Sequence, residues 1–92
     1  MQNEFTRSGH MEPQNLALAV LGWILGDGPR AERLLDLTGL TPDLLRERLG
    51  DPGVLAAVLE FLINHEPDLV RASDELQITP QQIVAAHESL SR

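Results

Sequence analysis

Two stretches of this chain match each other at an offset of 38 residues, and this similarity constrains the fold more than any other feature. Residues 16–49 align without gaps on residues 54–87, and eight of the 34 aligned positions are identical. Repeats with a period in this range indicate a supersecondary unit copied in tandem. The alternative is two helical segments that share one pattern of helix stops. Both interpretations predict two similar three-helix units.

Each unit is expected to begin with an apolar helix, over residues 16–25 in the first unit and 54–63 in the second. Large apolar side chains cover most of the surface of both segments, so we expect these two helices to form the centre of the fold. Trp23 and Phe61 take equivalent positions, and both are expected to face the core. One side of the first helix carries small residues at helical spacing, namely Asn15, Ala19, Gly22 and Gly26.

Proline marks where the remaining helices begin. The second helix of each unit is expected to start at Pro29 or Pro67, because the first helical turn tolerates proline. The third helix starts at a Thr-Pro pair in both units, residues 41–42 and 79–80, with the threonine as N-cap. In the second unit Gln82 completes a capping box. Glycines are expected to end the three helices of the first unit, at Gly26, Gly39 and Gly50.

These patterns predict an all-α fold, a compact bundle of about six helices in two pseudo-equivalent three-helix units. No stretch alternates between polar and apolar residues for long enough to indicate a strand. The units span about residues 13–50 and 51–92, within a single domain of residues 12–92. Two repeats are too few for a solenoid, so we expect the units to close on each other. Residues 1–11 are polar and aperiodic and are expected to form a flexible tail, either native or left from cloning.

Charge and cysteine content exclude several classes of protein. The chain carries 14 acidic residues against 7 basic ones, and its net charge of −7 disfavours nucleic acid and anionic membranes as partners. The longest apolar run, residues 16–25, is too short to span a bilayer. The absence of cysteine excludes disulfides, thiolate nucleophiles and cysteine-ligated metals. With no cysteine and no apolar leader, we expect a cytoplasmic protein.

A helix-turn-helix pattern spans residues 72–83. As a DNA-binding motif it would present Gln81, Gln82, Ala85 and Glu88, and glutamine can pair with adenine. However, residues 80–90 contain no arginine or lysine, and DNA-binding proteins position themselves through phosphate contacts. We therefore favour a packing role for this motif and keep a helix-turn-helix DNA-binding protein as the alternative function.

The residues that could carry other chemistry do not form a recognisable pattern. The chain has three histidines, His10, His65 and His87, and a helical metal site would want its ligands three or four residues apart. His87 and Glu88 are adjacent, so their side chains diverge on a helix, and His65 and Glu66 precede Pro67 at a helix junction. The serines and threonines are better explained as helix caps or surface groups than as nucleophiles. We therefore predict no catalytic residue, no metal and no cofactor.

Two Arg-Asp pairs recur at a spacing of three residues, Arg33 with Asp36 and Arg71 with Asp74. They are interpreted as exposed helix ion pairs, which contribute a few tenths of a kcal/mol. The alternative is that each arginine ties the second helix of its unit to a neighbouring helix.

The second unit is the more acidic of the two. Over the aligned residues the first unit carries a net charge of −1 and the second −4, a difference that a shared packing pattern does not require. One hypothesis is a surface of Asp68, Asp74 and Glu75 that attracts a basic protein partner. The alternative is that the negative charge only keeps the domain from associating. A monomer is expected, with a homodimer as the alternative.

The segments Leu-Thr-Gly-Leu-Thr-Pro-Asp-Leu, residues 37–44, and Asp-Pro-Gly-Val-Leu-Ala-Ala-Val-Leu-Glu-Phe-Leu, residues 51–62, resemble a bacterial family of small helical proteins known only as domain of unknown function 3572. The resemblance extends from Asn15-Leu16-Ala17-Leu18 to the Thr79-Pro80 helix and covers about residues 13–90. It implies an all-α bacterial domain and brings no catalytic residues. We therefore expect a non-catalytic protein-interaction or regulatory module.

Overall fold

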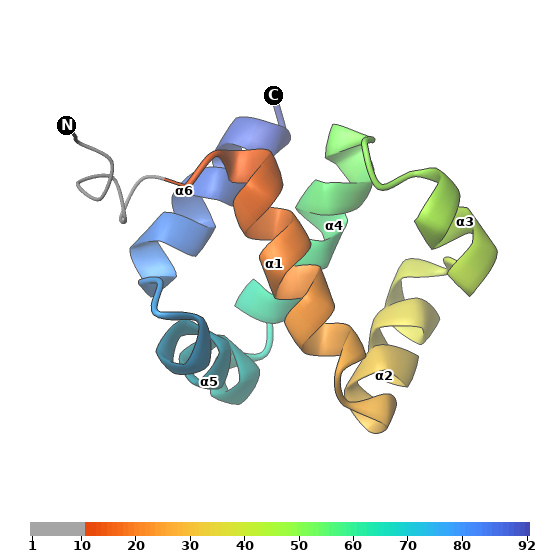
Figure 1. The fold of residues 1–92 in the computed structure, drawn as a ribbon, viewed down its shortest axis with the longest axis horizontal. Helices are drawn as coiled ribbons and strands as arrows, with labels where there is room; N and C mark the ends of the chain where they lie inside the picture. The colour runs from red at the N-terminus through yellow and green to blue at the C-terminus, as the bar shows by residue number, and fades with distance from the viewer. Residues whose placement is uncertain (1–10) are drawn as a thin grey trace, which may run out of the picture.

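Each helix of the computed structural model, which describes residues 11–92, has a proline among its first two residues. Proline is favoured there because its fixed φ suits a helix and its missing N–H would have no partner in the first turn. The described residues form six helices and no strand (Figure 1), which confirms the predicted all-α fold. The helices are α1 (Pro13–Leu25), α2 (Gly28–Thr38), α3 (Pro42–Glu47), α4 (Pro52–Ile63), α5 (Glu66–Leu76) and α6 (Pro80–Leu90).

Side chains cap four of these helices. Asp27, Thr41, Asp51 and Thr79 each accept a hydrogen bond from a backbone N–H in the first turn of α2, α3, α4 and α6 respectively. The predicted capping box of Thr79 and Gln82 is confirmed. None of the six helices in residues 11–92 is long and apolar enough to cross a membrane. The predicted tail, residues 1–11, falls outside the described residues except for Met11.

The second helices end in the same way in both units. Gly39, after α2, has a φ of 74°, and Gln77, after α5, has a φ of 60°, so both residues adopt the left-handed conformation. Gly39 is the helix-ending glycine expected from the sequence. Gly26, also expected to end a helix, follows α1 but keeps a right-handed φ of −74°, so glycine's freedom is not used there.

α1 and α4 lie at the centre, as predicted, and α6 packs against both of them. In Figure 1, α5 and α6 lie to one side of α1, and α2 and α3 lie to the other. α4 alone contributes seven buried residues. The largest fully buried side chains come from α1, α2, α4 and α6: Leu16, Val20, Ile24, Leu34, Leu55, Val58, Leu59, Leu62 and Ile83.

The third helix of the first unit differs from its counterpart. α3 ends at Glu47, so the expectation that it would run to Gly50 is wrong. It makes no helix contact as extensive as those of α6 with α1 and α4. At an offset of 38 residues, exposed Arg48 aligns with Ala86, which is buried in α6. An arginine cannot enter the core there without a partner for its charge, which agrees with the peripheral position of α3.

The bounds of α2 and α5 coincide at this offset, but the third helices do not take equivalent places. A tandem duplication therefore stays a hypothesis.

Candidate functional site

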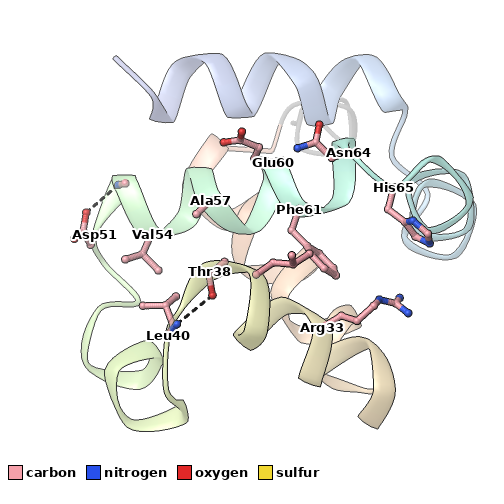
Figure 2. Close-up of a pocket in the computed structure, with 12 residues that line it drawn as sticks. Arg33, Thr38, Leu40, Asp51, Val54, Ala57, Glu60, Phe61, Asn64 and His65 are labelled. Atoms are coloured by element: carbon pink, nitrogen blue, oxygen red, sulfur yellow. Dashed lines mark hydrogen bonds between the residues drawn. The ribbon is translucent and has the colours of Figure 1, made fainter.

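A groove of about 710 Å³ lies between α2 and α4 (Figure 2). Five apolar side chains line it, two from the end of α2 and the turn that follows, and three from α4. They are Leu37, Leu40, Val54, Ala57 and Phe61. The remaining lining residues are Gly53 and a polar set: Arg33, Thr38, Asp51, Glu60, Asn64 and His65.

The turn between α2 and α3 shapes one wall of the groove. The Thr38 hydroxyl donates a hydrogen bond to the Leu34 carbonyl at 2.7 Å and accepts one from the Leu40 N–H at 3.3 Å. Together with the left-handed Gly39, these bonds reverse the chain directly after α2. Leu40 is thereby held opposite α4, at one side of the groove (Figure 2).

Leu37 is the most exposed large apolar residue in the described part of the chain, at 75%. Phe61, on the opposite side of the groove, is only 7% exposed. The groove thus joins the hydrophobic core to an apolar residue at the surface.

An ionic cluster around Asp68 borders one end of the groove. The Asp68 carboxylate, 12% exposed, lies 3.0 Å from the Arg33 guanidinium and 3.7 Å from Nε2 of His65. Nε of Arg30 lies 4.0 Å from the same carboxylate. Arg33 and His65 also line the groove (Figure 2). A buried carboxylate therefore faces three groups that can carry positive charge, and Asp68 links α5 to α2.

Arg30 extends this network to Trp23. Its guanidinium lies 3.7 Å from the centroid of the indole ring and donates a hydrogen bond to the Trp23 carbonyl at 3.2 Å. The indole Nε1–H donates a hydrogen bond to Glu75 at 2.6 Å. Trp23 is only partly buried and packs against the core, whereas its counterpart Phe61 is buried, so the two side chains have different environments.

The three residues predicted to contact a partner do not form one free acidic surface. Asp68 is buried and ion-paired, and Glu75 accepts the hydrogen bond from Trp23. Asp74 is exposed. Their role in partner binding stays a prediction. The helix ion pairs expected within α2 and α5 are absent from the described residues; Arg33 pairs with Asp68 instead of Asp36, as in the alternative interpretation.

The rim of the groove away from Asp68 is acidic. The Glu60 side chain is 62% exposed, and its Oε1 lies 3.7 Å from the imidazole Nε2 of His87. Asp51, at the start of α4, is exposed, and its carboxylate accepts a hydrogen bond from the Gly53 N–H at 2.8 Å. No arginine forms an ion pair with either carboxylate in residues 11–92.

The helix-turn-helix predicted from the sequence is formed by α5 and α6. Gln81, Ala85 and Glu88 are exposed on α6, whereas Gln82 contributes to the capping box. Within residues 11–92, no group of three or more histidine and acidic side chains could hold a metal ion. His10 lies outside the described residues.

The groove was not predicted from the sequence. The available signal was the pair of apolar residues close to the glycine that follows α2, Leu37 and Leu40. The apolar residues of α4 that line the groove, Val54, Ala57 and Phe61, occur at spacings of three and four and so share one face of the helix.

Fold and site together define a small all-helical domain whose apolar groove opens between its second and fourth helices. The chain belongs to the family described as protein of unknown function (DUF3572), whose model matches residues 10–92. No curated protein and no solved structure matches the chain.

Proposed function

We propose that this protein is a non-catalytic protein-interaction module that binds a segment of a partner protein in the groove between α2 and α4. The observation that carries the proposal is the exposure of Leu37 beside apolar residues continuous with the core. Contiguous apolar surface on a small domain marks interaction sites, since leaving it in water is unfavourable. We also propose that the protein is located in the cytoplasm of a bacterium.

The shape of the site favours a macromolecule over a small metabolite. A volume of about 710 Å³ is within the range of pockets for small molecules, but such pockets enclose most of their ligand. Here a residue that is 75% exposed borders the groove. A partner that covers Leu37 and also fills the space beside Phe61 would remove both from water.

The groove is a better candidate than the other two surfaces considered. Asp68 and Glu75 are already engaged within the molecule, which leaves Asp74 as the free member of the predicted acidic set. The exposed face of α6 offers Gln81 and Glu88 but no cation for DNA phosphates. Protein binding therefore ranks ahead of DNA binding.

Site-specific photo-crosslinking in the source cells tests the proposal. Benzoylphenylalanine in place of Leu37 should crosslink to a partner protein, because this position borders the groove. The matched control places the same group at Val70, on α5, an apolar residue that is 56% exposed and does not line the groove. A Leu37→Glu variant, which should keep its fold, should lose the partner in a pull-down. Equal crosslinking at both positions, or none at position 37, would contradict the proposal.

A further inference from the structure

The walls of the groove are helical, and this restricts the backbone conformation of its occupant. No strand occurs in residues 11–92, so this part of the molecule offers no sheet edge to pair with an extended segment. The N–H and C=O groups of an extended segment would lie against apolar side chains without hydrogen-bond partners. A helix satisfies its own backbone groups and can place one apolar face in such a groove.

The apolar residues of α4 set the size of the contact. Val54, Ala57 and Phe61 span two turns on one face, which is about 10 Å along the helix axis. Leu37 and Leu40 face them from the other wall. A partner helix that presents apolar residues at positions i, i+3 or i+4, and i+7 would match a stripe of this length.

The charge of the rim indicates which residues flank that apolar face. Asp51 and Glu60 line the groove and are exposed, and neither is ion-paired with an arginine. Arg33, which also lines the groove, lies at the Asp68 end, where it shares the buried carboxylate of Asp68 with Arg30. The rim away from Asp68 therefore carries two exposed carboxylates without an arginine partner, and this charge favours basic side chains beside the apolar face of the occupant.

A second copy of this chain is a poor match for the same reason. The chain contains no lysine, and its net charge of −7 makes two copies repel each other. We therefore propose that the α2–α4 groove binds an amphipathic helix of another protein whose apolar face is bordered by lysine or arginine. This inference rests on the proposed function and specifies the chemistry of the partner.

The test uses three synthetic peptides and the full ¹⁵N-labelled chain. The first peptide is helical, with leucine at i, i+3, i+7 and lysine on both flanks. The second replaces each lysine by glutamate, and the third keeps the lysines but carries central prolines that prevent a helix. Amide chemical shifts should change at Leu37, Leu40 and Phe61 with the first peptide, which should bind about tenfold more tightly than either of the others.

Salt and substitution provide the matched controls. The preference for the lysine peptide should shrink as the salt concentration rises toward about 0.5 M, since the rim charges are exposed. Glu60→Gln should weaken binding of the lysine peptide several-fold, whereas Glu88→Gln, on the exposed face of α6, should leave it unchanged.

The outcomes separate this inference from the proposed function. Equal affinity for the lysine and glutamate peptides, with shifts in the groove, would overturn the basic partner and leave the groove as a binding site. Equal binding of the proline peptide would overturn the helical partner. Chemical-shift changes confined to α5 and α6, or none in the groove with any peptide, would overturn the inference. If crosslinking at position 37 also failed, the proposed function would be overturned as well.

Discussion

α3 and α6 begin with the same Thr-Pro cap, yet only α6 closes the hydrophobic core. Ile83 and Ala86 of α6 are buried where this helix packs on α1 and α4. α3 buries Leu45, the counterpart of Ile83, but ends before Arg48, which is exposed at the position that corresponds to buried Ala86. Two helices with the same N-terminal cap therefore need not pack equally well against the core. The exposed arginine at the position of a buried alanine distinguishes the peripheral third helix from the one that closes the core.

The largest effect is expected from exchanging these two residues. Ala86→Arg should lower the free energy of unfolding by about 4 kcal/mol, because the larger side chain overpacks the core and its charge has no partner there. Arg48→Ala should change stability by less than about 0.5 kcal/mol, since Arg48 is already in water. Urea unfolding of both variants measures the difference. Similar losses of stability in the two variants would contradict the difference in packing between α3 and α6.

Removal of the buried aliphatic side chain at equivalent positions should give the next largest effect. Ile83→Ala should cost about 3 kcal/mol, because Ile83 is fully buried among helices that cannot collapse into the cavity. Leu45→Ala should cost about half as much, since α3 is free to move toward the vacated space. Thermal unfolding provides a second readout. A larger loss at Leu45 than at Ile83 would show that α3 is as essential to the core as α6.

The N-caps of α3 and α6 offer a smaller comparison. Thr79→Ala should cost about 1 kcal/mol, because its hydroxyl accepts the Gln82 N–H in a complete capping box. Thr41→Ala removes one hydrogen bond from the Leu44 N–H and should cost about half as much in global unfolding, because α3 contributes less to the core. Equal losses in urea would mean that both helices are coupled equally to global stability.

The smallest effect concerns the left-handed residues after α2 and α5. Gln77→Gly should stabilise the protein by about 0.5 kcal/mol, since the relief of a left-handed glutamine exceeds the loss of its side-chain bond to the Asp74 carbonyl. Gly39→Gln should destabilise it by a similar amount. The midpoint of urea unfolding resolves both shifts. Destabilisation by Gln77→Gly would show that the hydrogen bond is worth more than the backbone relief.

Features encoded in short segments could be predicted from the sequence. The prolines and threonines place the starts of α2, α3, α5 and α6 to within one residue, because capping is decided by a few neighbouring residues. The apolar segments of α1 and α4 indicate the centre of the fold, since a helix that is apolar on most sides must be buried.

Features that depend on distant residues could not be predicted. The sequence pattern pairs Arg33 with Asp36 on the same helix, whereas in the structure its partner is Asp68, 35 residues away. The same contact makes Asp68 a buried ion-pair member instead of an exposed acid. The groove needs the placement of α2 against α4, which is not contained in the local pattern.

Native-state hydrogen exchange of the free protein tests most directly whether α6 closes the hydrophobic core while α3 is packed only loosely at the periphery. Amides of α6 from residue 84 to residue 90 should exchange only through global unfolding, because their helix packs on both α1 and α4. The amides of Leu45 and Arg48, bonded to Thr41 and Leu44, should exchange at least about a hundredfold faster through local opening of α3. Equal protection of α3 and α6 would contradict the account, because α3 would then be as firmly packed as α6.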